Sequence, residues 1–157
     1  MASEPASATT FSPEQVELLR DVLDRLIPSN ERLPGAGESG IADYVAGAAA
    51  ESKGLSDLLA NGLALIESVS QADHSNRFRD LSGEQRDGVL KRIEQEQELF
   101  FQELVRHTYN GYYSNSRVIE ALGLDPRPPQ PRGYTVEAGN LALIENVKRR
   151  GQMYRDA

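Results

Sequence analysis

The chain has 157 residues, enough for one domain with a single hydrophobic core. Its formal net charge of −7 argues against nucleic acid or an anionic membrane surface as the main partner, because both are negatively charged. The sequence contains no cysteine, which excludes disulfides, thiolate zinc sites, iron–sulfur clusters and covalently attached c-type haem. It also lacks a run of about 18 apolar residues, so we expect no direct membrane insertion.

The first helix is predicted at residues 12–27. Ser12-Pro13-Glu14-Gln15 combines a serine N-cap, a proline at the first helical position and a glutamine that closes a capping box. The apolar residues that follow recur at helical spacing: Val16, Leu19, Val22, Leu23, Leu26 and Ile27. Pro28 ends this pattern, and residues 28–40 contain prolines and glycines without periodicity, which predicts a loop.

The middle of the chain predicts further helices. A short helix with a small-residue face starts at Ile41, and a longer one covers residues 55–70. Residues 71–78 are polar and include His74, so we expect an exposed loop there. Ser82 and Gln85 repeat the capping-box pattern and predict a helix start near residue 83. Whether 83–112 forms one helix or two is open at this point.

The last third of the chain changes character. Asn110-Gly111 is expected to end the preceding helix, because both residues tolerate left-handed geometry. A short helix at 116–122, ended by Gly123, is followed by a proline-rich arm at 124–134, which we expect to be extended. A final helix at 140–150 carries a basic last turn that suits the helix dipole.

No segment shows sustained alternation of apolar and polar residues, so the predicted fold class is all-α. We expect a single small helical bundle of about five to six helices with a proline-rich extended arm. Residues 1–10 are small and polar and are expected to form a disordered segment before a helical domain at 11–157.

The sequence offers little for catalysis. It has no glycine-rich dinucleotide fingerprint, no phosphate-binding loop and two histidines. Glu103 and His107 share a helix face, which is half of a metal site at most, and a di-iron bundle would need Glu-x-x-His twice. We therefore assign no catalytic, cofactor-binding or metal residues and expect His107 to pack near a helix end. A small stand-alone enzyme using His107 with Glu103 or Tyr112 is the alternative.

The stretch from Tyr109 to Tyr134 is the best candidate for partner binding. Tyr109 is expected to close the core, whereas the adjacent Tyr112 and Tyr113 cannot both point inward. The proline-rich arm either crosses its own bundle or docks on another chain, which costs an extended segment little entropy. The hypothetical partner-binding set is Tyr109, Tyr112, Tyr113, Arg117, Arg127, Pro128, Pro129, Pro131 and Tyr134.

Several blocks in this order resemble the gluconate 2-dehydrogenase subunit 3 family. The most characteristic are the helix that ends in Ile27-Pro28, the block Gly40-Ile41-Ala42-Asp43-Tyr44-Val45, and His107-Thr108 followed by Gly111-Tyr112-Tyr113-Ser114. The remaining blocks are Phe11-Ser12-Pro13-Glu14-Gln15, Pro34-Gly35-Ala36, Phe78, Leu81-Ser82, Phe100-Phe101, Leu104 and Leu122-Gly123. The resemblance covers nearly the whole chain.

The resemblance implies a non-catalytic small subunit of a dehydrogenase whose FAD-dependent large subunit belongs to the glucose–methanol–choline oxidoreductases. Such a subunit binds no cofactor itself and supports the folding, export or stability of the flavoprotein. A cytochrome c subunit accepts the electrons in membrane-associated complexes of this kind. A transient chaperone or export escort for the flavoprotein is the related alternative. Many members carry a twin-arginine signal, which is absent before Phe11, so we expect a cytoplasmic protein, or a periplasmic one if a signal was removed.

Overall fold

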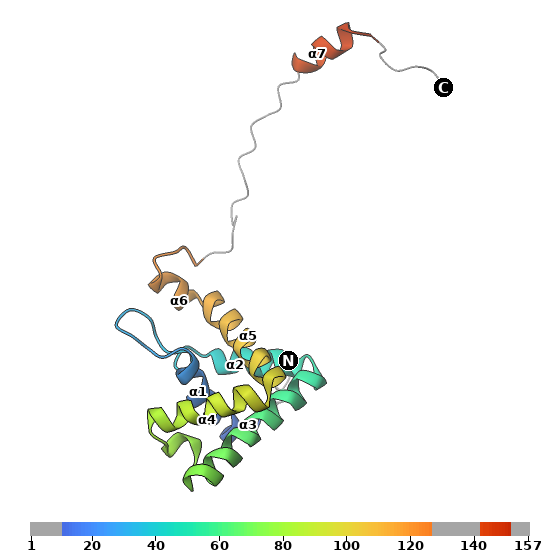
Figure 1. Ribbon diagram of the computed structural model, residues 1–157. Coiled ribbons are helices and arrows are strands. Elements are labelled where there is room, and N and C mark those ends of the chain that lie inside the picture. The colour runs from blue at the N-terminus through green and yellow to red at the C-terminus, as the bar shows by residue number, and fades with distance from the viewer. Residues whose placement is uncertain (1–10, 127–141, 152–157) are drawn as a thin grey trace, which may run out of the picture. The chain divides into compact units, whose positions relative to one another are not determined.

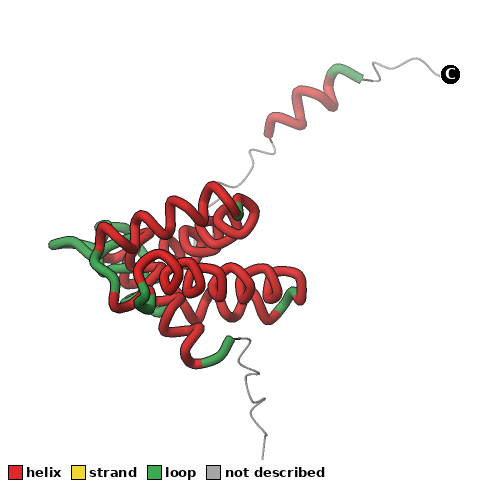
Figure 2. The backbone as a smooth tube through the Cα atoms, turned by 60° about the horizontal axis from the view of Figure 1, so that its bottom comes forward, coloured by secondary structure: helices red, strands yellow, loops and turns green. Residues whose placement is uncertain are grey.

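The computed structural model describes residues 11–126 and 142–151 (Figure 1). These residues belong to two compact units, one ending at Pro126 and the other starting at Arg127. All the described residues of regular structure are helical, so the predicted all-α class is confirmed (Figure 2). No described helix has both the length and the apolarity needed to cross a membrane.

Helix α1 (Pro13–Leu26) begins as the sequence predicts. The Ser12 side chain accepts a hydrogen bond from the Gln15 amide, and the Gln15 side chain accepts one from the Ser12 amide, which closes the capping box. Leu19, Val22 and Leu23 form its buried face. A loop follows and leads to α2 (Ile41–Ala50), which contacts α1, α3 and α5.

Helix α3 (Lys53–His74) is longer than the predicted 55–70, and the exposed loop expected at 71–78 is wrong in two respects. The helix continues through His74 and stops only where Ser75 adopts a left-handed φ of 55°. Apolar spacing ends at Val69, but the next polar turn remains helical. Phe78, in the short 3₁₀ helix η1 (Phe78–Asp80), is fully buried and belongs to the core.

Helices α4 (Gly83–Glu96) and α5 (Glu98–Ser114) are separate, which answers the open question about residues 83–112. Gln97 breaks the helix with a φ of −134° and a ψ of 57°. The predicted stop at Asn110-Gly111 is wrong, because α5 continues to Ser114. A Cβ on Gly111 would lie 2.6 Å from Cδ1 of Tyr44, so this glycine allows α2 to approach α5 closely.

Helix α6 (Ser116–Ala121) ends at Gly123 as predicted. Gly123 has a φ of 78°, the Leu124 amide donates to the Ile119 carbonyl, and the Gly123 amide donates to the Glu120 carbonyl. This pairing is the Schellman motif, which satisfies the last carbonyls of a helix. In the second unit, α7 (Ala142–Arg149) confirms the helix predicted at 140–150.

The buried side chains of the first unit form one hydrophobic cluster to which α1 to α6 and η1 all contribute. Within it, α3 and α5 pack closely, because a Cβ on Gly62 would lie 2.1 Å from Cδ2 of Phe100. A charged contact also links distant segments, since Nε and Nη2 of Arg25 on α1 donate to Asp87 on α4 over 2.8 and 2.6 Å.

We predict that Gly62→Ala destabilises the fold. Alanine is a better helix former by about 1 kcal/mol, but its methyl group would overlap the ring of Phe100, and overpacking costs about 1–3 kcal/mol. The net loss should be up to about 2 kcal/mol of unfolding free energy in urea denaturation. The control is Gly88→Ala on α4, which has open space around it and should be neutral or stabilising. Equal effects of the two substitutions would contradict the close packing.

Candidate partner-docking surface

The loop between α1 and α2 is held against the helices rather than free. The Gly37 amide donates to Oδ1 of Asp24 over 2.7 Å, and the Ala36 amide donates to the Ile27 carbonyl over 3.0 Å. A Cβ on Gly37 would lie 2.4 Å from the Arg20 carbonyl oxygen, so only glycine fits this approach to α1. The second half of the loop is therefore a fixed part of the structure.

The end of α5 holds the same loop from the other side. Tyr112 is 1% exposed, and its hydroxyl donates a 2.7 Å hydrogen bond to the Pro34 carbonyl. Burial, with a smaller contribution from Tyr113, raises the pKa of Tyr112, so the phenol remains a neutral donor at physiological pH. Asn115 adds a second link, since its amide nitrogen donates to the Ser39 carbonyl over 2.9 Å.

Two tyrosines of α5 lie at the surface and contact each other. The rings of Tyr109 and Tyr113 stack with centroids 5.9 Å apart and planes 20° apart, although the side chains are 46% and 55% exposed. Tyr113 also meets the buried Tyr112 edge-on, with centroids 5.4 Å apart. The divergence of Tyr112 and Tyr113 is confirmed, whereas the expectation that Tyr109 closes the core is wrong.

Exposed apolar side chains recur between the last turns of α5 and the residues that follow α6. Seven large hydrophobic side chains are exposed among the described residues, and four of them fall between Tyr109 and Leu124. Leu122 and Leu124 follow α6, and the exposed Arg117 lies on it. We call Tyr109, Tyr113, Arg117, Leu122 and Leu124 the α5–α6 surface. Apolar exposure of this kind is typical of protein–protein contact sites.

The predicted partner-binding residues thus separate into three groups. Tyr109, Tyr113 and Arg117 are exposed, while Tyr112 is buried and supports the loop. The rest of the set lies outside the described residues: Arg127, Pro128, Pro129, Pro131 and Tyr134. Sequence reasoning missed Asn115, Leu122 and Leu124. An N-cap signal before α6 would have indicated Asn115, whose Oδ1 accepts from the Arg117 amide over 3.0 Å.

The expectation that His107 packs near a helix end is wrong: it lies in the middle of α5, because the helix continues to Ser114. Its side chain is partly enclosed and has polar neighbours at Nε2. Its Nε2 lies 3.6 Å from Oε2 of Glu103 and 3.3 Å from a guanidinium nitrogen of Arg106, and its Nδ1 is buried without a hydrogen-bond partner. Arg106 also pairs with Glu103. Within the described ranges, no three histidine or carboxylate side chains gather in a way that could hold a metal ion.

A comparison of the sequence with known protein families identifies the family of the chain. The sequence model of gluconate 2-dehydrogenase subunit 3 matches residues 13–124, which is most of the chain. The chain belongs to this family. The family's name describes a subunit of a gluconate 2-dehydrogenase complex. No curated protein and no solved structure matches the chain.

We predict that Tyr112→Phe weakens the attachment of the loop between α1 and α2 to α5 in this subunit 3 family member. The substitution removes the hydrogen bond to the Pro34 carbonyl but keeps the buried ring, so the expected loss is about 1 kcal/mol of unfolding free energy. Amide hydrogen exchange should also quicken in residues 34–39. The matched control is Tyr113→Phe, because the Tyr113 hydroxyl has no hydrogen bond within the described part of the chain. A loss of the same size in both variants would contradict the claim that the Tyr112 hydroxyl holds the loop.

Proposed function

We propose that this chain is a non-catalytic accessory subunit. It binds the FAD-dependent catalytic subunit of a sugar, polyol or gluconate-type oxidoreductase and stabilises it or helps it to mature. The observation that carries the proposal is an exposed tyrosine stack on a chain whose family is named as a dehydrogenase subunit. A surface stack of this kind leaves two amphipathic rings ready for a partner chain.

Two features support placing the flavin in the partner. The sequence has no glycine-rich dinucleotide fingerprint, and FAD binding in Rossmann-type domains uses that loop. The most reactive candidate on α5, His107, has 14% side-chain exposure and a neighbouring glutamate and arginine. Arg106 and His107 both lie in the middle of α5 and pair with Glu103 of the same helix, so we assign the chemistry to the large subunit.

The α5–α6 surface supports a direct contact with that subunit. Tyrosine and arginine are enriched at the centres of interfaces, because tyrosine buries a large ring with few rotatable bonds and the planar guanidinium of arginine forms paired hydrogen bonds and stacks on rings. Tyr109 and Tyr113 already restrain each other by stacking, so docking would cost them little conformational entropy. We expect a permanent complex to bury more than about 2,000 Å² in total. We propose the segment from Arg127 to Tyr134, which lies outside the described residues, as a further contact with the same partner.

Co-expression with an FAD-dependent large subunit from the same organism tests the function. We expect a stable complex that co-elutes in size-exclusion chromatography at micromolar concentration, whose dehydrogenase activity is unchanged by His107→Ala. Separate elution of the two proteins would refute the subunit assignment. Loss of activity in an intact His107→Ala complex would instead favour the enzyme alternative. The rate at which the chain dissociates from the flavoprotein separates the two forms of the proposal. A permanent subunit should dissociate over hours, and a transient chaperone or export escort should dissociate faster.

The tyrosine stack should carry much of the affinity. Truncation of a central interface tyrosine costs about 2 kcal/mol, so we expect Tyr109→Ala with Tyr113→Ala to raise the Kd for the flavoprotein at least about 100-fold. The melting temperature of the free subunit should change little, because both side chains are largely exposed. Leu99→Ala is the control, as Leu99 is an exposed apolar residue on the first turn of the same helix. Unchanged affinity in the double variant would show that the tyrosine stack is not part of the interface.

A further inference from the structure

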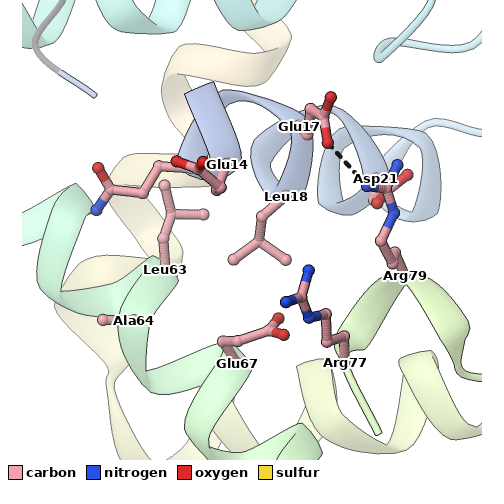
Figure 3. A pocket seen from close by; sticks show the side chains of 10 residues that line it. Glu14, Glu17, Leu18, Asp21, Leu63, Ala64, Glu67, Arg77 and Arg79 are labelled. Atoms are coloured by element: carbon pink, nitrogen blue, oxygen red, sulfur yellow. Dashed lines mark hydrogen bonds and ion pairs between the residues drawn. The ribbon is translucent and has the colours of Figure 1, made fainter. Parts of the chain in front are cut away.

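A groove of about 360 Å³ lies on the first unit (Figure 3), and none of the residues of the α5–α6 surface lines it. Helices α1 and α3 form its walls, and the segment leading into η1 closes one side. Leu18, Leu63 and Ala64 supply an apolar lining, while the charged groups stand around it. Apolar lining with a few placed polar groups is the usual make-up of a binding site.

The charges of the groove do not balance. Four carboxylates line it, those of Glu14, Glu17, Asp21 and Glu67, against the guanidinium groups of two arginines. Arg79 is already paired with Glu17 over 2.8 Å, an ion pair that raises the pKa of Arg79. The groove therefore has an excess of negative charge, and it suits a cationic group better than an anionic one.

Asp21 stands out among the four carboxylates because its Oδ2 is buried and has no hydrogen-bond partner within the described part of the chain. Arg79 and Arg86 lie close enough to stabilise its charge, yet both are engaged: Arg79 with Glu17, and Arg86 with the backbone carbonyls of Leu81 and Arg79. Burial outweighs their effect and raises the pKa of Asp21. A buried carboxylate oxygen without a donor is costly, and a bound cation would remove that cost.

We propose that this groove is a second docking point for the flavoprotein subunit, and that it takes an arginine or lysine side chain of that subunit. The apolar stem of such a side chain would lie on Leu18 and Leu63, and its charged head would donate to Asp21. The charge complementarity and the apolar floor beside one unpaired carboxylate argue for this occupant. The inference rests on the proposed subunit function.

The variant Asp21→Asn tests the proposal, because it should change the melting temperature and the Kd in different ways. Asp21→Asn keeps the shape of the side chain but removes the buried charge, so the free protein should melt at the same temperature or higher. The Kd of the complex with the flavoprotein, measured by calorimetry, should nevertheless rise at least about tenfold, the effect of losing one charged hydrogen bond. Ala64→Arg should weaken binding too, because the new side chain fills the groove and supplies its own cation.

Asp57→Asn is the matched control. Asp57 is on α3, outside the groove, and pairs with Lys53 at the surface, so this variant changes the net charge equally and should bind like the wild type. If the wild-type chain does not bind the flavoprotein, the subunit function fails. If it binds and Asp21→Asn binds as tightly, only the groove assignment fails. A lower melting temperature in Asp21→Asn, with normal binding by Ala64→Arg, would give Asp21 a purely structural role and also overturn the proposal.

Discussion

The end of α5 packs against α2 and against the loop between α1 and α2. This contact determines the shape of the candidate docking region. Tyr112 fills the core at this point, and Gly111 lets α2 come close. Burying about 150 Å² of an aromatic side chain at about 25 cal/mol per Å² contributes at most about 4 kcal/mol. The hydrogen bond to the Pro34 carbonyl adds only about 1 kcal/mol. Burial of the ring therefore supplies most of the stability, and the hydrogen bond sets where the loop lies.

The exposure of the tyrosine stack follows from that burial. Successive residues on an α-helix are about 100° apart, so the inward orientation of Tyr112 turns Tyr113 towards the edge of the buried face. Tyr109 is four residues before Tyr113 and lies on the same side, where the two rings stack. The α5–α6 surface is thus a geometric consequence of core packing, and any change that rotates α5 would alter both.

Local signals in the sequence predicted what local interactions decide. The two serine capping boxes, the glycine stop after α6 and the all-α class depend on neighbours in sequence, and all are present. The failures concern contacts between distant segments. Asn110-Gly111 has the local chemistry of a helix stop, but packing on Tyr44 and Ile41 of α2 keeps the helix intact. The groove beside Asp21 brings together residues about 60 positions apart, which no local pattern encodes.

The two proposed docking points differ in chemistry, and the difference suggests different contributions to one interface. An aromatic surface gains affinity from buried area but discriminates weakly among apolar partners. A groove with excess negative charge repels an acidic surface and attracts a basic one, which favours orientation and the rate of association. Because the whole chain carries a net charge of −7, long-range attraction already favours a basic partner face. On our proposal, Asp21 would convert that general attraction into a preference for one residue, because a cation in the groove would offset the cost of its buried, unpaired charge.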